Sequence, residues 1–194
     1  MDKIRDSADI LQPEKEETYQ FIEKLLSSVK ENFSTNRVHL GMDEAVMLGL
    51  GNYLKENGYK KGSLIIREHC NRVVDICRKL ELKPMIWSDM YITANSTGGY
   101  YDLPENTDCS KWEKPKKDLG LVYWDYYHDD TRTYEKMLDI HAQLSDNVIF
   151  AGGSWIWNGI SPNYSKTYAC TKAALSTCKK YNIKEVLCTA WMDN

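Results

Sequence analysis

Apolar positions along this chain follow two periods, one typical of helices and one typical of buried strands. Recurrence at every third or fourth position predicts helices over residues 16–33, 45–56, 64–80, 131–144 and 165–181. Short, nearly continuous apolar runs predict strands over residues 37–40, 83–87, 119–125, 147–152 and 185–191. Residues 1–14 show no period. Residues 88–117 form a long, irregular stretch, and loops of this length are usually functional or disordered. Ser165 is the expected N-cap of the last helix.

This alternation of helices and strands is typical of an α/β fold, with parallel strands covered by crossover helices. Five strands fit either a doubly wound sheet or part of a (β/α)8 TIM barrel. No glycine-rich fingerprint follows a strand, which weakens a nucleotide-binding Rossmann interpretation. Polar and aromatic residues gather at strand ends, where both architectures place their active sites, and the barrel is the preferred prediction. A whole barrel needs about 250 residues, whereas this chain has 194. We therefore expect a single partial barrel domain over 1–194, with roughly the last five strands and their helices.

Composition excludes several classes of function. The formal net charge of -3 disfavours nucleic acid and anionic membranes as partners. No apolar run approaches the roughly 20 residues of a membrane span. The six cysteines form no CxxC pair, and no His/Cys cluster has metal-ligand spacing, so we expect no metal. Mostly free thiols, with no signal peptide in residues 1–17, predict a reducing compartment and a cytoplasmic location.

Two adjacent acids, Asp43 and Glu44, end the first predicted strand. Glycosidic hydrolysis needs an acid to protonate the leaving oxygen and a second group to stabilise the oxocarbenium-like centre. Gly41 would permit the sharp turn that such a pair requires. Alternatively, Asp43 caps the following helix and Glu44 lies in its first turn, where both favour the helix dipole. The dipeptide alone leaves both interpretations open.

The neighbouring residues favour the catalytic interpretation. The run from His39 to Glu44 reads HLGMDE, and it resembles the His-x-Gly-x-Asp-Glu signature of the family 20 glycoside hydrolases, the β-N-acetylhexosaminidases. It looks closest to the bacterial branch, which residues 85–90 (MIWSDM) and 122–127 (VYWDYY) also resemble. The resemblance covers most of the chain, from the helix before the fourth barrel strand to the end of the eighth.

The resemblance implies an exo-acting, retaining enzyme that removes terminal GlcNAc or GalNAc from β-linked N-acetylhexosamine glycans or glycosides, without a cofactor. The substrate's acetamide would be the nucleophile, and an oxazolinium intermediate would form. Asp43 would orient the acetamide, Glu44 would act as acid and then base, and Tyr123 would donate a hydrogen bond to the acetamide carbonyl. The implied sugar-binding residues, among which Trp155 and Trp157 compete for one wall, are His39, Trp87, Asp125, Trp155, Trp157, Trp191 and Asp193.

Two features depart from the family pattern. Many members have Glu at the position of Asp193, and the family's sugar-binding arginine from the first barrel strand is not found, as if the first three strands were missing. Two further functions therefore stay open. One is a non-catalytic carbohydrate-binding fragment, and the other is a retaining glycosidase with an enzymic carboxylate as nucleophile.

Overall fold

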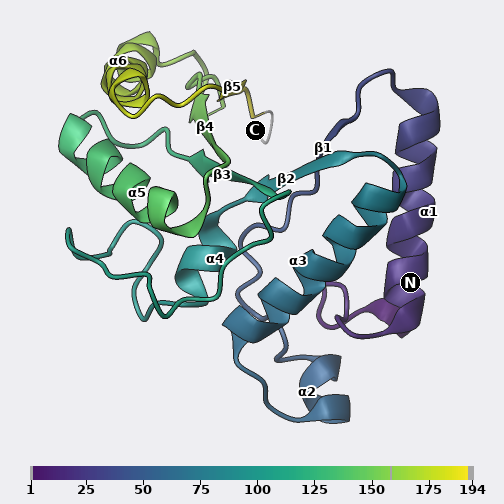
Figure 1. Cartoon of the computed structure of the whole chain (residues 1–194). Coiled ribbons are helices and arrows are strands. Elements are labelled where there is room, and N and C mark those ends of the chain that lie inside the picture. The colour runs from purple at the N-terminus through teal and green to yellow at the C-terminus, as the bar shows by residue number, and fades with distance from the viewer. Residues whose placement is uncertain (1, 158, 192–194) are drawn as a thin grey trace. The chain divides into compact units, whose positions relative to one another are not determined.

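Parallel strands flanked by helices make up both units into which the chain divides in a computed structural model (Figure 1). The structure describes residues 2–157 and 159–191. The first unit comprises Met1–Leu103 and Lys111–Leu119, and the second comprises Pro104–Ser110 and Gly120–Asn194. The predicted α/β class is confirmed, whereas the assignment of 1–194 to one domain stays a prediction.

In the first unit, β1 (Arg37–His39) pairs in parallel with β2 (Lys83–Trp87). Helices α1 (Glu16–Asn32) and α3 (Gly62–Lys79) lie side by side and cover one face of this pair (Figure 1). They do so because the apolar residues of each helix recur on one face. The core that these faces form contains Tyr19, Ile22, Leu26, Val73, Ile76, Cys77 and Leu82, with Val38, Leu40 and Met42 packed against it.

The predicted helix over 45–56 is wrong in its first half, because α2 spans only Asn52–Asn57 and residues 46–51 form turns and bends. The cause lies far away in the sequence. The buried carboxylate of Asp6, which follows the short 3-10 helix η1 (Asp2–Ile4), accepts the N–H groups of Gly49 at 2.8 Å and Tyr53 at 2.7 Å. Asp43 and Glu44 therefore lie well before the helix, which excludes the capping interpretation.

The stretch 88–117, predicted as irregular, begins with a short helix, α4 (Asp89–Thr93). Its side chains from Asp89 to Ile92 are buried. The buried Ser88 hydroxyl, just before the helix, lies 2.8 Å from the Tyr100 hydroxyl. This link ties the loop back to the end of β2.

In the second unit, β3 (Gly120–Trp124), β4 (Val148–Gly153) and β5 (Val186–Thr189) pair in parallel. Helices α5 (Thr131–Leu144) and α6 (Tyr164–Lys180) pack side by side in this unit (Figure 1). The N-cap of α6 is Asn163, whose side chain accepts the Lys166 N–H at 3.0 Å. The prediction of Ser165 as the cap is wrong, because the Asn163 oxygen reaches the first turn two residues earlier.

Five of the six cysteines are buried thiols, and Cys188 is an exposed one. Within 2–157 and 159–191, no group of three or more His, Cys, Asp or Glu side chains could hold a metal ion. None of the helices described has the length and apolar character needed to cross a bilayer. The cellular compartment stays a prediction.

Removal of the Asp6 carboxylate tests whether it holds the loop after Glu44. The Asp6→Ala change leaves the N–H groups of Gly49 and Tyr53 without their acceptor. Each unsatisfied buried group costs about 1–3 kcal/mol, so the free energy of unfolding of the chain should fall by about 2 kcal/mol or more. Urea denaturation followed by circular dichroism measures it. Asp9→Ala is the control, since Asp9 bonds Ser7 at an exposed site, and equal losses would contradict the assignment.

Candidate functional site

The backbone turns left-handed directly after β1. The φ angle is 71° at Gly41, 69° at Met42 and 48° at Glu44. Such angles cost a residue with a Cβ atom about 1–2 kcal/mol, so contacts around the turn must hold Met42 and Glu44 in place. The side chains of Asp43 and Glu44 are exposed at this turn. The predicted use of Gly41 in a sharp turn beside the two acids is confirmed.

Three hydrogen bonds hold this turn in place. The Gly41 N–H donates to Nδ1 of His39 at 3.1 Å, and the Gly41 carbonyl accepts the Trp87 N–H at 3.1 Å. The Glu44 N–H donates to the carboxylate of Asp89 at 2.8 Å. Asp89 is only 3% exposed, and the sequence analysis gave it no role. An acid that closely follows a buried strand is the sequence feature that could have identified Asp89.

His39 and Trp87 pack ring against ring beside the turn, with centroids 4.3 Å apart and planes tilted by 52°. Burial lowers the pKa of His39 below its usual value, and the charge of Asp43 opposes this effect. The ring is therefore neutral at pH 7. Because Nδ1 accepts the Gly41 N–H, the ring proton lies on Nε2. The carboxyl ends of β1 and β2 thus bring together four predicted site residues: His39, Asp43, Glu44 and Trp87.

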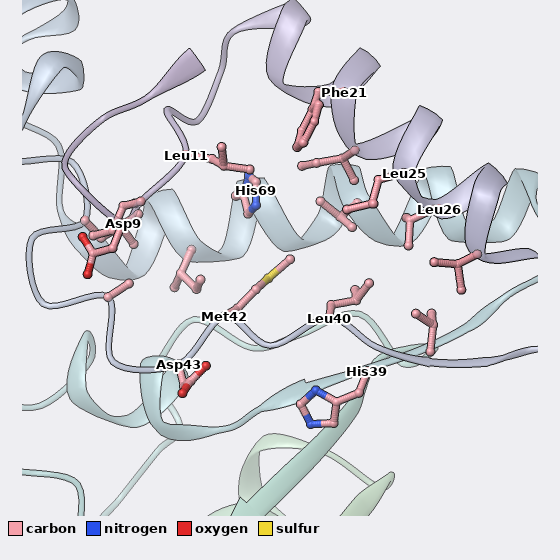
Figure 2. A pocket seen from close by; sticks show the side chains of 18 residues that line it. Asp9, Leu11, Phe21, Leu25, Leu26, His39, Leu40, Met42, Asp43 and His69 are labelled. Carbon is pink, nitrogen blue, oxygen red and sulfur yellow. The ribbon is translucent and has the colours of Figure 1, made fainter. Parts of the chain in front are cut away.

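A cavity of about 490 Å³ lies between β1 and the helices α1 and α3. Figure 2 shows Leu40 and Met42 pointing toward these helices, whereas His39 and Asp43 point away from them. Phe21, Leu25, Leu26, Val38, Leu40, Ile66 and Val73 are among the apolar side chains of its lining. A lining of this kind suits an apolar segment better than a sugar.

Tyr123 lies near the end of β3, with its side chain fully buried. Its ring centroid is 4.8 Å from that of His141 and 5.4 Å from that of Phe150. His141 of α5 is also fully buried, which lowers its pKa to about 4. The Tyr123 hydroxyl donates to the Asp125 carboxylate at 3.0 Å. The hydroxyl hydrogen of Tyr123 thus already has an acceptor inside the protein.

Asp125 is also buried, and four groups of the second unit contact its carboxylate. One oxygen accepts the N–H groups of Tyr127 at 2.9 Å and His128 at 3.2 Å. The other oxygen lies 3.0 Å from the Tyr123 hydroxyl and 2.8 Å from Nδ1 of His128. Since a carboxylate offers about four lone-pair sites, these contacts account for them all. Asp125 therefore fixes the turn that follows β3.

Trp155 and Trp157 follow β4 and stack on each other, with centroids 5.0 Å apart. Trp155 is 6% exposed, its indole N–H donates to the Tyr126 carbonyl, and the Lys166 ammonium lies 4.0 Å above its ring. Trp157 is half-buried and meets the Tyr126 ring edge-on at 5.3 Å. The two predicted wall residues thus belong to one aromatic stack, in which Trp157 is the more exposed member.

Trp191 follows β5 and is 37% exposed. Asp193 lies outside the described residues, so its placement stays a prediction. The described site residues of the second unit are Tyr123, Asp125, Trp155, Trp157 and Trp191. The catalytic and sugar-binding roles assigned to residues of both units stay predictions.

Comparison with protein families identifies one match. The family model described as "Glycosyl hydrolase family 20, catalytic domain" matches residues 2–145, well over half of the chain. No curated protein sequence matches significantly.

Comparison with solved structures finds partial similarity to two bacterial enzymes. One is the GH20 exo-β-N-acetylglucosaminidase of Vibrio harveyi in complex with N-acetylglucosamine, with 18% identity and a TM-score of 0.47 over 74% of this chain and 19% of that chain. Another comes from the tandem GH20 catalytic modules of the pneumococcal exo-β-D-N-acetylglucosaminidase StrH, with 18% identity and a TM-score of 0.42 over 94% of this chain and 41% of that chain. The chain thus spans about a fifth to two fifths of these solved chains.

Gly153, at the end of β4, makes room for the tryptophan stack. A Cβ atom there would lie 2.7 Å from the Trp157 ring, 2.9 Å from the Thr189 hydroxyl and 3.2 Å from Tyr126. Gly153→Ala should therefore displace Trp157, lower the free energy of unfolding by about 1–3 kcal/mol, and change the near-ultraviolet circular dichroism of the aromatic residues. Gly62→Ala is the control, since its Cβ would meet Ala94 at an ordinary 3.8 Å. An unchanged aromatic spectrum in Gly153→Ala would contradict this role.

Proposed function

The chain belongs to glycosyl hydrolase family 20, and from that premise we propose that it carries the catalytic acids of an exo-acting, retaining β-N-acetylhexosaminidase. The observation that carries the proposal is the left-handed turn after β1, which exposes Asp43 and Glu44 side by side. The substrates are β-linked N-acetylhexosamine glycans or glycosides that end in GlcNAc or GalNAc.

The proposed reaction has two steps. In the first, the acetamide oxygen of the substrate attacks the anomeric carbon while Glu44 gives its proton to the departing glycosidic oxygen. Asp43 orients the acetamide and stabilises the positive charge of the oxazolinium that forms. In the second step, Glu44 takes a proton from water as that water attacks the anomeric carbon, which regenerates the acetamide and retains the β configuration. Holding the nucleophile on the substrate makes the first step intramolecular and therefore fast.

The buried Asp89 supports this division of labour. It accepts the N–H of Glu44, so it fixes the backbone of the acid without using the reactive carboxyl group. Tyr123 is proposed to bind the acetamide carbonyl and Asp125 a ring hydroxyl. Since these two side chains bond each other at 3.0 Å, substrate binding must share or exchange that hydrogen bond.

Two alternatives lead to different outcomes. A glycosidase with an enzymic nucleophile needs a second carboxyl group about 5 Å from the acid, and it would cleave sugars that lack the 2-acetamido group. A non-catalytic carbohydrate-binding fragment would bind sugar without turnover. Because this chain spans only part of the solved chains that it matches, the second alternative stays open for the isolated chain.

Comparing two substrates tests the mechanism in the longest natural polypeptide that contains this chain. We expect kcat/KM for an aryl β-GlcNAc to exceed that for the matching aryl β-glucoside by at least about 100-fold, because only the first carries the internal nucleophile. Glu44→Gln should lower kcat/KM for the aryl β-GlcNAc by about 100-fold to 10,000-fold, as expected for loss of a general acid. Release of the aryl group is measured by absorbance.

Glu17→Gln, a change in the first turn of α1, is the matched control and should keep full activity. Similar rates on both sugars would exclude the acetamide mechanism. An unchanged rate in Glu44→Gln would exclude Glu44 as the acid. Binding of GlcNAc without any turnover would favour the carbohydrate-binding alternative.

We also infer that β1 to β5 are the fourth to eighth strands of a (β/α)8 barrel. Helix α1 leads directly into β1, and a helix that crosses over to a parallel strand normally follows a strand beside it. Among the described residues before α1, the pairing is one antiparallel bridge between Arg5 and Leu11. The preceding strand would therefore come from another part of the protein.

The cavity beside β1 fits such a strand. It lies between β1 and α1, it is lined mostly by apolar side chains, and β1 pairs only with β2 among the described residues of this unit. Leu25 of α1 lines the cavity and is 53% exposed. A parallel strand placed there would pair with the open edge of β1 and cover Leu25.

Leu25→Glu should therefore change stability by different amounts in two proteins. In the isolated chain Leu25 is exposed, so the free energy of unfolding should change by less than about 0.5 kcal/mol and binding of an apolar dye should fall. In the longer natural protein the change should cost about 2 kcal/mol or more, since it replaces a covered leucine with a charge. Lys24→Glu, on the exposed neighbour, is the control. Equal small effects in both proteins would rule out a strand in the cavity.

A further inference from the structure

The loop that follows the two acids turns a group of aliphatic side chains toward solvent. Val46 is 82% exposed, Met47 50% and Leu50 43%, and residues 45–53 include no charged side chain. Single apolar residues are common on protein surfaces, whereas a group of large exposed apolar side chains marks a surface that binds a partner or a ligand. We call residues 45–50 the aliphatic loop.

Contacts on the inner side hold the aliphatic loop in place. The Val46 N–H donates to the Glu44 carbonyl at 2.7 Å, and a series of turns follows directly after the acid. Leu48 lines the cavity beside β1, and the Gly49 N–H donates to the buried carboxylate of Asp6 at 2.8 Å. The side chains that face solvent therefore belong to a loop whose path away from Glu44 is set by hydrogen bonds.

The proposed reaction places the leaving group of the substrate beside this loop. Glu44 protonates the departing oxygen from hydrogen-bonding distance, so the leaving group must lie next to the Glu44 side chain. Met47 is three residues further along the chain, and its Cα atom therefore lies within about 11 Å of the Glu44 Cα atom. Val46 is one residue closer along the chain. The exposed side chains of the aliphatic loop are thus within reach of an extended leaving group.

The chemistry of the aliphatic loop indicates which leaving group suits it. The hydroxyl groups of a hexose need hydrogen-bond partners when they leave water. Valine and leucine side chains offer no donor or acceptor, and methionine offers only a weak acceptor. Residues 45–50 also include no aromatic ring on which the face of a sugar could stack. An alkyl or aryl group, in contrast, is stabilised when it leaves water against aliphatic side chains, and methionine adapts to irregular apolar shapes.

We propose that the aliphatic loop binds the leaving group of the substrate, and that this leaving group is an apolar alkyl or aryl alcohol instead of a second hexose. The inference rests on the proposed function, because the role of Glu44 places the leaving group. It narrows the substrates to N-acetylhexosaminides with an apolar aglycone.

Alkyl β-GlcNAc substrates of different chain length test this inference in the longer natural protein. Butanol and octanol are leaving groups of equal intrinsic reactivity, so a difference between them reports binding of the added methylene groups. We expect kcat/KM for octyl β-GlcNAc to exceed that for butyl β-GlcNAc by about 10-fold or more, because these methylene groups leave water on the loop. The β-linked dimer of GlcNAc, which has a hexose as its leaving group, should have a lower kcat/KM than octyl β-GlcNAc. Chromatography of the released GlcNAc measures each rate.

Substitutions identify the residues that make the contact. In the double variant Val46→Ser with Met47→Ser, the ratio of kcat/KM for octyl to butyl β-GlcNAc should fall to about 2, since most of the apolar contact is lost. Leu175→Ser is the matched control, because Leu175 is also 43% exposed but lies on α6, and it should keep the wild-type ratio. Because each ratio is taken within one protein, a loss of folded protein lowers both rates equally and leaves the ratio unchanged.

The outcomes distinguish this inference from the proposed function. Equal kcat/KM values for butyl and octyl β-GlcNAc in the wild type would overturn the inference and leave the proposed function intact. A wild-type ratio in the double variant, or faster cleavage of the GlcNAc dimer than of octyl β-GlcNAc, would also overturn the inference alone. No hydrolysis of any β-GlcNAc compound would overturn the proposed function and, with it, the inference.

A measurement of accessibility does not depend on activity. In the longer natural protein, the Met47→Cys change should add a thiol that a maleimide labels, above the labelling of the wild type. Octyl β-GlcNAc in the S-linked form should slow this labelling about 2-fold or more, and the S-linked methyl compound should not. A Met47→Cys thiol that the maleimide does not label would show that another part of the protein covers the aliphatic loop, which would overturn the inference.

Discussion

The left-handed turn between β1 and the acids is the constraint on which this site depends. Met42 and Glu44 adopt backbone angles that a residue with a Cβ atom disfavours. The Gly41 N–H bonds the His39 ring, and the Glu44 N–H bonds the Asp89 carboxylate. These two acceptors stabilise backbone angles that Met42 and Glu44 alone would disfavour, and they thereby set where the side chains of Asp43 and Glu44 emerge from the chain.

This arrangement also explains the loop that follows. Asp6 binds the N–H groups of Gly49 and Tyr53, so residues 46–51 are held by an acceptor outside the helix. Gly51 approaches Asp6 so closely that a Cβ atom would lie 2.0 Å from the Asp6 carbonyl oxygen. The loop is therefore specified by contacts with the N-terminal segment.

The sequence could predict those helices and strands whose own apolar residues, by their spacing, select the face that is buried. α5 begins and ends at the predicted residues, and α3 and β2 agree closely, because their apolar residues alone select one buried face. Errors occurred where a distant partner decides. The start of α2 depends on Asp6, the buried helix α4 depends on packing, and the role of Asp89 depends on a loop 45 residues away. The motif around Asp43 located the candidate site, but the hydrogen bonds of Tyr123 and Asp125 were not visible in it.

Burial separates five acids of this chain into three that hold a loop and two that are exposed to solvent. Asp6, Asp89 and Asp125 are at most 3% exposed, and each accepts at least one backbone N–H from a loop that follows a strand. Asp43 and Glu44 are exposed and lie on the loop that Asp89 holds. Hydrogen bonds from backbone N–H groups to a carboxylate are strong, so a buried aspartate can impose a loop conformation that the loop residues alone would not adopt. Residue type alone does not distinguish these two kinds of acid. The burial and the hydrogen-bond partners of an acid at a strand end must therefore be known before a chemical role is assigned to it.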